Sequence, residues 1–478
     1  MFFSLFDLSS SLAEWLLALM YVLLAGIVTL DVLLKKSDVR GALGWIGAAW
    51  MSPILGALLY YMFGINRVTR RSLRLPRLHG TPVPASGTGQ PLAASENILM
   101  LSKIGETVTT YPVVAGNAVT VLQGGDAAYP AMLAAIENAQ CCIALTSYIF
   151  RNDAAGRAFG DALASARKRG VEVRVLLDSV GIGYFFPLIL YRLKAAGVPA
   201  ARFLHTWLPW RMPFLNMRNH RKLLVIDGAT AFMGGMNIGA ENSRRLAPDT
   251  YIDDIHFKIQ GQSVRFAMDA FARDWAFTTG EPLDDDRWWP EIAPAGPVFA
   301  RGLRSGPDSD IYKIETILGA ALTLAKRRVR IVTPYFLPDQ RLQFAIAQAC
   351  LRGVEVEIVI PERCDYIFLD WAMRAHLRFF KEISARICAT RAPFDHSKLV
   401  TVDGEWCLIG SSNWDTRSFR LNFEFDMECY DRAFAARIDA IIDSKLAHAS
   451  ALDMRTLCEA PLPVRLRDAA ARLMTPYL

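Results

Sequence analysis

Two short segments of the chain repeat the same chemically active residue types at the same spacing. In each, a lysine follows a histidine by two positions, an aspartate follows the lysine by five, and an asparagine follows the aspartate by ten. The repeated residues are His220, Lys222, Asp227 and Asn237 in the first segment and His396, Lys398, Asp403 and Asn413 in the second. Two matches at identical offsets are hard to obtain by chance, so we expect one active site assembled from two homologous halves.

Each segment is predicted to form a β-hairpin that presents its histidine and lysine together. The strand-like runs 223–226 and 399–402 both lead into an Asp-Gly pair, which is a strong hairpin-turn signal. Residues two apart on a strand point to the same face, so each histidine projects with its lysine. Two such halves would surround one cavity with two imidazoles, two ammonium groups and two amides. This set of groups suits a phosphoryl group that develops negative charge.

Two histidines can supply a nucleophile and a general acid near neutral pH, because imidazole titrates in that range. Each ring then needs a partner on its second nitrogen to fix its tautomer. We expect Asp254 to serve His220 and Glu424 to serve His396, since these carboxylates lie 34 and 28 residues beyond their histidines.

The other titratable residues are given structural interpretations. Asp227 and Asp403 stand directly before glycine, which favours a role in the turn over a role in catalysis. The histidines outside the two segments have no repeat partner: His79, His205, His256, His376 and His448. The sequence has no HExxH motif, no P-loop and no Cys/His ligand cluster, so we expect no metal and no other cofactor.

The composition points to a large protein with membrane segments. The 478 residues can fill two domain cores, and 52% of them are hydrophobic while only 21% are charged. Five arginines lie between residues 67 and 77, and such a cluster suits either anionic lipid or nucleic acid. The eight cysteines show no CxxC spacing, which is typical of reduced, buried thiols.

Residues 1–66 are predicted to be a membrane anchor of two transmembrane helices. Residues 15–30 carry no charge, and residues 41–63 form a second uncharged stretch of 23 residues. About 20 apolar residues are enough to span the hydrocarbon core as a helix. Pro53 would kink the second helix, which membrane helices tolerate. A cleaved signal peptide fits poorly, because no lysine or arginine precedes the first stretch.

The flanking charges leave the orientation of the anchor open. The arginine cluster that follows the second stretch favours a catalytic body on the cytoplasmic side of the inner membrane, with both helices crossing it. Lys35, Lys36 and Arg40 in the connecting loop argue for the opposite orientation.

The rest of the chain is predicted to be an internally duplicated α/β protein. A linker at 67–110, rich in Pro, Gly, Ser and Thr at 75–95, precedes a first half at 111–285, a second linker at 286–309 and a second half at 310–478. The two halves share a predicted strand, helix and strand, at 142–150, 155–168 and 171–177 and at 329–336, 340–351 and 354–360. Both helix-to-strand junctions read Arg-Gly-Val-Glu-Val. Such alternation implies mixed sheets covered by helices.

These motifs resemble the HKD signature of the phospholipase D superfamily, and the whole chain is similar to its bacterial cardiolipin synthase branch. The resemblance rests on the two apolar N-terminal stretches and on the segments Tyr148-Ile-Phe150, 218–222, 234–237, 333–339 and 410–413. It implies two α/β halves with one central site, in which His220, Lys222, Asp227, His396, Lys398 and Asp403 form the catalytic set. Asn237 and Asn413 support that set. Gly235 stands where Ser411 stands in the second motif, an asymmetry that the synthases share.

The resemblance also implies a reaction. His220 attacks one phosphatidylglycerol to give a phosphatidyl-histidine while His396 protonates the departing glycerol, and a second phosphatidylglycerol then takes the phosphatidyl group to yield cardiolipin. No nucleotide is needed, because one phosphodiester replaces another. A phosphatidyltransferase or phospholipase D that uses phosphatidylethanolamine or water remains an alternative. A nuclease is disfavoured by the membrane segments, and a catalytically inert scaffold by the intact motifs.

Aromatic residues before the first motif suggest contact with lipid. Trp207 and Trp210 lie in the stretch 203–217, and residues 180–190 are strongly apolar. We also expect Tyr335, in the 333–339 segment, to contact the substrate. Aromatic rings beside arginine are typical of a membrane interface. Ordinary packing of a core helix and loop explains the same residues equally well.

Overall fold

The computed structural model describes residues 2–36, 39–64, 91–207, 217–307 and 310–475. These residues belong to two compact units. One unit contains residues 1–73 and 206–216, and the other contains residues 74–205 and 217–478.

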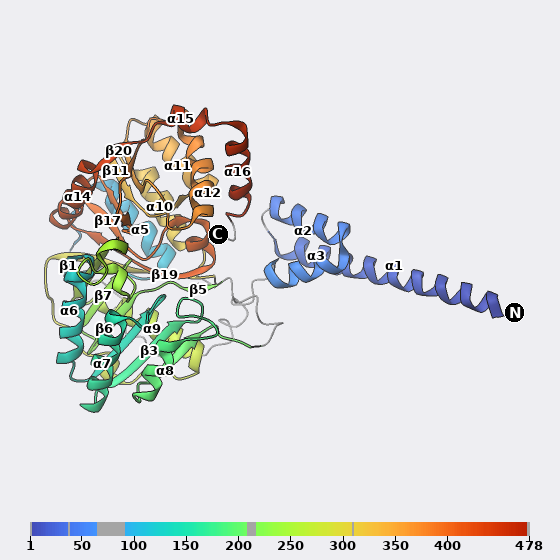
Figure 1. Ribbon diagram of the computed structural model, residues 1–478. Coiled ribbons are helices and arrows are strands. Elements are labelled where there is room, and N and C mark those ends of the chain that lie inside the picture. Colours follow the sequence, from blue (N-terminus) through green and yellow to red (C-terminus); the bar gives the residue numbers. More distant parts are fainter. Residues whose placement is uncertain (1, 37–38, 65–90, 208–216, 308–309, 476–478) are drawn as a thin grey trace. The chain divides into compact units, whose positions relative to one another are not determined.

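The N-terminal unit contains one helix that is long and apolar enough to cross a membrane. Helix α1 (Phe2–Lys35) carries this segment at Leu12–Lys35. The second predicted span is not one helix, because it is divided into α2 (Val39–Met51), α3 (Pro53–Leu59) and the π-helix η1 (Tyr60–Gly64) (Figure 1). The break falls at Ser52, directly before Pro53, which has no N–H to donate to a continuing helix. The hydropathy prediction was based on the length of the apolar stretch. It therefore assumed one helix with a kink at Pro53 and not two separate helices.

The first half of the larger unit alternates strands and helices. Its strands are β1 (Val114–Gln123), β2 (Cys142–Ser147), β3 (Glu172–Asp178), β4 (Ala200–Phe203), β5 (Arg218–Asn219), β6 (Leu223–Ile226), β7 (Thr230–Gly234), β8 (Ile252–Asp253) and β9 (Ile255–Gln260). Its helices are α6 (Gly124–Asn138), α7 (Ala154–Lys168), α8 (Leu188–Ala195) and α9 (Val264–Thr279), with short 3₁₀ turns η3 (Ala240–Asn242), η4 (Pro248–Thr250) and η5 (Asp286–Trp288).

The second half repeats this alternation. Its strands are β10 (Val298–Ser305), β11 (Arg328–Val332), β12 (Phe336–Leu337), β13 (Glu355–Pro361), β14 (Arg386–Thr390), β15 (Phe394–Asp395), β16 (Leu399–Val402), β17 (Trp406–Gly410), β18 (Trp414–Asp415), β19 (Asn422–Tyr430) and β20 (Ala449–Ala451). Its helices are α5 (Glu96–Thr109), α10 (Lys313–Leu324), α11 (Gln340–Leu351), α12 (Ile367–Leu377), η6 (Arg378–Glu382), α13 (Thr416–Arg420), α14 (Arg432–Ala447), α15 (Met454–Cys458) and α16 (Leu462–Leu473).

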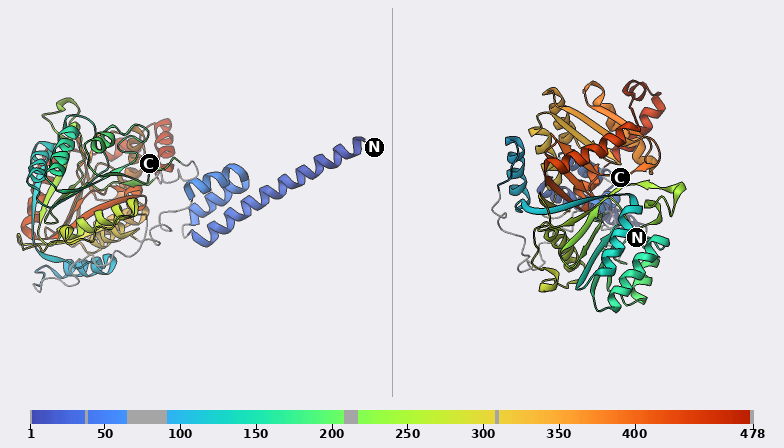
Figure 2. Two further views of the ribbon diagram at one scale, coloured as in Figure 1. Left: turned by 90° about the horizontal axis from the view of Figure 1, so that it is seen from below. Right: turned by 90° about the vertical axis from the view of Figure 1, so that its left-hand side faces the viewer.

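A single sheet of 16 strands joins the two halves. The first half contributes the order β4-β3-β2-β6-β7-β9-β1, and the second contributes the matching order β14-β13-β11-β16-β17-β19-β10. The two sets meet where β1 and β10 pair antiparallel, with Val114 opposite Ala300. In the right-hand view of Figure 2, cyan and green helices cover the strands of the first half, and orange and red helices cover those of the second. The duplication in the sequence is therefore a duplication of sheet topology about the β1–β10 seam.

Two segments that we expected to be linkers belong to this framework. Strand β10 lies within 286–309 and pairs with both β1 and β19. Helix α5 lies within 67–110 and buries Ile98 and Leu101 in the core of the second half. Both segments follow stretches rich in turn-forming residues, and that composition concealed the apolar residues that dock them.

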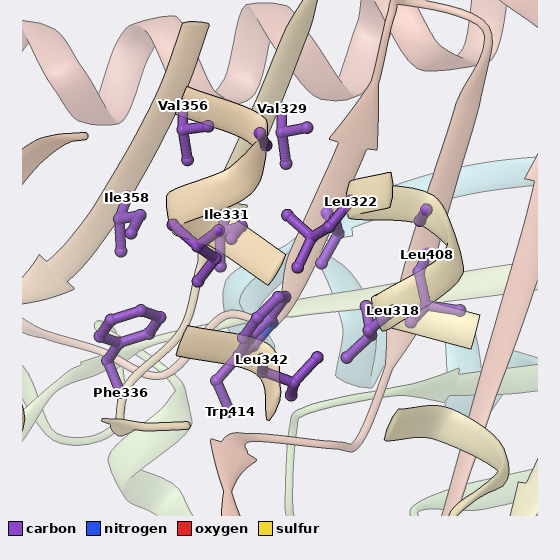
Figure 3. Close-up of a cluster of buried hydrophobic side chains, with 14 of the residues drawn as sticks. Leu318, Leu322, Val329, Ile331, Phe336, Leu342, Val356, Ile358, Leu408 and Trp414 are labelled. Atoms are coloured by element: carbon purple, nitrogen blue, oxygen red, sulfur yellow. The ribbon is translucent and has the colours of Figure 1, made fainter. Parts of the chain in front are cut away.

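Each half has its own hydrophobic core. In the second half, side chains from β11, β13 and α10 converge with Phe336 and Trp414 (Figure 3). In the first half, Phe159 of α7 and Leu163 pack against strands β2 and β3 in the equivalent layer. These cores hold the central strands that carry the two motifs.

The two motif hairpins form as predicted. Strand β6 pairs antiparallel with β7, and β16 pairs antiparallel with β17. Asp227 and Gly228 have φ values of 49° and 60°, and Asp403 and Gly404 have values of 55° and 69°. Positive φ at both central residues is the conformation of the tight hairpin turn that Asp-Gly favours.

Candidate active site

Two short crossing strands bring the motifs together. Strand β5, directly before His220, pairs parallel with β19 of the other half. Strand β15, directly before His396, pairs parallel with β8 of the first half. The backbone N–H of His220 donates to the carbonyl of Phe423 at 2.9 Å, and that of His396 donates to the carbonyl of Asp253 at 2.7 Å. Each histidine is therefore held by a strand of the opposite half.

The crossing places each imidazole against a carboxylate of the opposite half. Nδ1 of His220 lies 3.0 Å from Oε2 of Glu424, and Nδ1 of His396 lies 2.7 Å from Oδ2 of Asp254. The expected pairing within each half is wrong. Glu424 and Asp254 directly follow the residues whose carbonyls accept the histidine N–H groups. The strand crossing therefore brings each carboxylate to the histidine of the opposite half. The repeat offsets could not show this, because equal offsets in two halves fit either pairing.

The two carboxylates are held differently. Oγ of Ser411 donates to Oε2 of Glu424 at 2.6 Å, and Nδ2 of Asn422 donates to its Oε1 at 3.1 Å. Oδ1 of Asp254 accepts the backbone N–H of Ile255 at 2.7 Å. A Cβ atom on Gly235 would lie 2.5 Å from the same Oδ1, so the glycine leaves room for the shorter aspartate. The Gly235/Ser411 asymmetry therefore matches the Asp254/Glu424 asymmetry.

These hydrogen bonds and charges make the pKa values of the carboxylates diverge. Burial raises the pKa of Glu424, although Lys222 and Ser411 oppose this shift. Burial acts in the same way on Asp254, but the nearby charges of Lys398 and His396 outweigh it and lower the pKa below its usual value. His396 therefore faces the more readily ionised partner.

Both imidazoles are buried among positive charges. Burial, Lys222, Lys398 and His396 together hold the pKa of His220 well below its usual value. Burial and Lys398 also lower the pKa of His396, but Asp254 acts in the opposite direction. His396 is itself one of the charges that act on His220, which is consistent with a single site.

The two lysines lie beside their own histidines, as their spacing predicts. Nζ of Lys222 donates to the carbonyl of His220 at 2.7 Å and lies 5.4 Å from the ring centre of Tyr148. Nζ of Lys398 donates to the carbonyl of His396 and lies 3.0 Å from its Nδ1. Burial lowers the pKa of Lys222 to about 7 and also lowers that of Lys398. The carboxylates of Asp254 and Glu424 act on both lysines in the opposite direction. Two buried ammonium groups beside two imidazoles suit an anion.

The two asparagines differ in their contacts. Oδ1 of Asn237 accepts the backbone N–H of Ile149 at 3.1 Å, so this amide positions the strand end that carries Tyr148. Oδ1 of Asn413 is buried and has no hydrogen-bond partner among the described residues.

The motif aspartates bind backbone groups rather than the imidazoles. Asp227 accepts the N–H groups of Gln140, Cys141 and Cys142 at 2.7–2.9 Å, and these residues lead into β2. Asp403 accepts the equivalent N–H groups of residues 326–328 at 2.8–3.0 Å, together with Nδ2 of Asn97 at 2.9 Å. Both carboxylates thus fix the start of the strand that neighbours their hairpin, β2 or β11.

Two tyrosines flank the imidazoles, each shortly after the central strand of its half. The ring of Tyr148, after β2, lies 5.0 Å from the ring of His220, and that of Tyr335, after β11, lies 6.3 Å from the ring of His396. Tyr335 also donates to Asp365 at 2.5 Å. We expected a substrate contact at Tyr335 but assigned no role to Tyr148. The signal that could have identified Tyr148 is in the sequence, where a tyrosine follows a threonine by two residues at both 146–148 and 333–335.

Two further buried groups lie beside the site without having been predicted there. His256, which we interpreted as structural, has no hydrogen-bond partner among the described residues, and burial lowers its pKa to about 4. Asp426 takes the equivalent position in the second half, where burial raises its pKa to about 7. Each lies two residues beyond a carboxylate that contacts a motif histidine, and opposite the glycine that ends the hairpin, Gly234 or Gly410.

The predicted lipid contacts before the first motif are only partly described. Trp207 is exposed, whereas Trp210 lies outside the described residues. Within the described part of the chain, no group of three or more His, Cys, Asp or Glu side chains could hold a metal ion.

Comparison with known proteins identifies relatives along nearly the whole chain. The family model described as cardiolipin synthase, PLD-like domain, matches residues 132–275 and 318–446. A cardiolipin synthase of Geobacillus kaustophilus is 30% identical over 94% of this chain and 91% of its own length. The major cardiolipin synthase ClsA of Bacillus subtilis is 30% identical over 98% of this chain and all of its own.

A solved structure supports the fold independently. A phosphatidylserine synthase of Haemophilus influenzae superposes with a TM-score of 0.63, covering 79% of this chain and all of its own, at 18% sequence identity. At that identity the likeness concerns the fold alone.

Proposed function

Because the chain belongs to the cardiolipin synthase family of PLD-like proteins, we propose that it transfers the phosphatidyl group of one phosphatidylglycerol to another, forming cardiolipin and releasing glycerol. The observation that carries the proposal is the pair of crossed histidine–carboxylate contacts around one buried, cationic site. A carboxylate on each Nδ1 leaves each Nε2 for the reaction. Phosphatidylglycerol, cardiolipin and the membrane are the partners, and neither nucleotide nor nucleic acid takes part.

The proton affinities favour His220 as the nucleophile and His396 as the acid. A nucleophilic imidazole must be neutral, and the pKa of His220 lies well below its usual value. A general acid must hold a proton. Burial and Lys398 lower the pKa of His396 as well, but Asp254 opposes that shift, whereas the pKa of His220 is lowered much further. The partners agree with this division, because the pKa of Glu424 is raised and that of Asp254 is lowered.

The proposed reaction has two displacements at one phosphorus. Nε2 of His220 forms a bond to phosphorus while the bond to the glycerol oxygen breaks, and His396 gives its proton to that oxygen. The hydroxyl group of the second phosphatidylglycerol then returns a proton to His396 as its oxygen attacks phosphorus and the P–N bond breaks. Lys222 and Lys398 stabilise the negative charge that develops on the phosphoryl oxygens in both steps.

The test supplies labelled phosphatidylglycerol as the sole lipid to the full-length protein. We expect cardiolipin and free glycerol in equal amounts, and a labelled phosphohistidine that can be trapped in the wild type but not in His220→Ala. Phosphatidic acid as the main product would instead identify a phospholipase D. Product only after addition of phosphatidylethanolamine would identify a different donor or acceptor.

We also propose that the chain resides in the inner membrane with its catalytic unit on the cytoplasmic side. Helix α1 supplies one crossing. The stretch 41–63 supplies the return as a bent helix, in which Tyr60 donates to Asp31 of α1 at 2.8 Å. Proteolysis of inverted and right-side-out vesicles tests this topology, because cleavage of the catalytic unit in right-side-out vesicles alone would exclude it.

A further inference from the structure

Two exposed apolar loops occupy equivalent positions in the two halves. Rim loop 1 (residues 179–188) connects β3 to α8, and rim loop 2 (residues 362–368) connects β13 to α12 and includes the start of that helix. At their tips, Phe186 is 81% exposed and Phe368 is 59% exposed. The remaining large exposed side chains of the two loops are Phe185, Leu188, Tyr366 and Ile367. The duplication has thus placed exposed aromatic and aliphatic side chains at the same point of the fold twice.

Rim loop 1 is fixed directly to the active site. Oδ1 of Asp178 accepts the N–H groups of Val180 and Gly181, and Oδ2 of the same carboxylate accepts the N–H of Asn219, which precedes His220. A Cβ atom on Gly181 would lie 2.0 Å from the carbonyl oxygen of Tyr148, so the loop backbone packs against that residue.

Rim loop 2 is fixed to the other side of the site. Its Asp365 accepts the hydroxyl group of Tyr335, the residue that flanks His396. The phenol of Tyr366 also lies within electrostatic range of Tyr148, against which rim loop 1 packs. Each loop is therefore attached to a tyrosine that flanks one of the two imidazoles.

We propose that the two rim loops insert their apolar tips into the surface of the bilayer and so seat the mouth of the active site on the lipid headgroups. The inference rests on the proposed function, because a lipid phosphodiester lies at headgroup depth and must reach the buried imidazoles without leaving the bilayer. The tips fit such a surface, since residues 182–188 and 366–369 carry no charge. Aromatic side chains at this depth bury the ring and keep polar edges wet.

Because of the duplication, the catalytic unit contacts the bilayer at two points, one in each half. A second copy of the chain could cover the same side chains, but the placement of both tips at the mouth of a lipid-processing site favours the bilayer. One loop alone would bury too little apolar area to orient the site.

The first experiment measures insertion without relying on activity. The full-length protein, with exposed Cys141 replaced by serine, is given Phe186→Cys or Phe368→Cys, labelled with a fluorescent maleimide and reconstituted in phosphatidylglycerol vesicles. Phe344→Cys on α11 is the matched control, because Phe344 is 62% exposed and lies outside both loops. We expect lipids with a quencher on the acyl chain to quench both loop labels several-fold more than the control label. Quenching equal to the control, or shielding that depends on protein concentration as in a dimer, would overturn the proposal.

The second experiment asks what insertion does for turnover. Phe186→Ser combined with Phe368→Ser should lower cardiolipin formation in vesicles on the order of tenfold, because two large apolar side chains no longer leave water. The same variant should process a short-chain, monomeric phosphatidylglycerol as fast as the wild type, and Phe344→Ser should change neither rate. An equal loss on both substrates would contradict the membrane role. If the wild type makes no cardiolipin, the proposed function fails, and the quenching experiment still decides whether the loops insert.

Discussion

At the scale of single residues, the two imidazoles differ mainly in the carboxylate that each one faces. The crossed contacts give His396 a readily ionised Asp254, and they give His220 a Glu424 whose pKa burial raises. His396 is therefore protonated more easily than His220, although the two sequence motifs are the same. In the proposed mechanism, the asymmetry between the nucleophile and the acid comes from these partners and their hydrogen bonds.

The crossed pairing predicts a specific change in the pH profile. Asp254 raises the pKa of His396, so Asp254→Asn should lower that pKa and leave less of the acid form at a given pH. The basic limb of kcat/KM should therefore move to lower pH by about one unit. The rate at the optimum should fall on the order of 10²-fold or more as the acid weakens.

Glu424→Gln is the matched control for this prediction. It should reduce the rate through His220 while leaving the basic limb in place, because Glu424 contacts His220 and not His396. A limb that moves with Glu424→Gln and stays fixed with Asp254→Asn would instead support pairing within each half. Both profiles can be measured as cardiolipin formation across the pH range with one assay.

At the scale of elements, the motif aspartates connect each hairpin to the neighbouring strand. Asp403 holds three successive N–H groups at the start of β11 and the side chain of Asn97 on α5. These donors cannot all be satisfied by an uncharged amide of the same size. We therefore expect the aspartate of the motif to contribute chiefly to stability.

Asp403→Asn should consequently lower the free energy of unfolding by about 2–4 kcal/mol, because a buried carboxylate and its donors lose their bonds. Below its unfolding temperature the variant should retain most of the specific activity of the wild type. Denaturant unfolding and kcat/KM on the same preparation check both statements. Asp249→Asn, at an exposed carboxylate, is the control and should change neither. Unchanged stability with lost activity would place Asp403 in the chemistry instead.

The elements also show how far local sequence patterns reach. The strands β6 and β16 and the helix α11 have the predicted bounds, because alternation, Asp-Gly turns and helix ends are local signals. The crossing strands β5, β8 and β15 are only two residues long and exist through partners in the other half. No local pattern could indicate them, and the exchange of carboxylates follows from them alone.

The predictions for the N-terminal stretch, for helix α5 and for strand β10 were wrong for identifiable reasons. Hydropathy predicted two spans, but Ser52 and Pro53 divide the second. Among the residues that the structure describes, α1 alone meets the length for a crossing. Helix α5 and strand β10 are set by docking onto the second half, which no linker composition can indicate. Tertiary contacts decided the cases of α5 and β10, whereas the local effect of Pro53 divided the N-terminal stretch.

At the scale of the whole molecule, the two halves share their stabilising contacts as well as their site. Their sheets join at β1 and β10. Arg221 of the first half donates to the carbonyls of Glu424 and Ser305 in the second at 3.0 and 2.9 Å. Lys445 of the second half bridges Asp253 and Asp395 at 2.8 Å each. Neither half can complete its histidine–carboxylate pair or its sheet edge alone.

This sharing predicts that residues 91–475 unfold as one cooperative body. Phe159→Ala in the first core should cost about 3–5 kcal/mol and Ile346→Ala in the second about 2–5 kcal/mol, since both side chains are fully buried. Each variant should shift the same single calorimetric transition, because loss of one half exposes the seam and the crossing strands of the other. Two separated transitions, with each substitution moving only one, would mean that the halves are stable on their own. In that case the crossed pairs would form only after two independently folded halves dock, and their geometry would depend on a weak interface rather than on the continuous sheet.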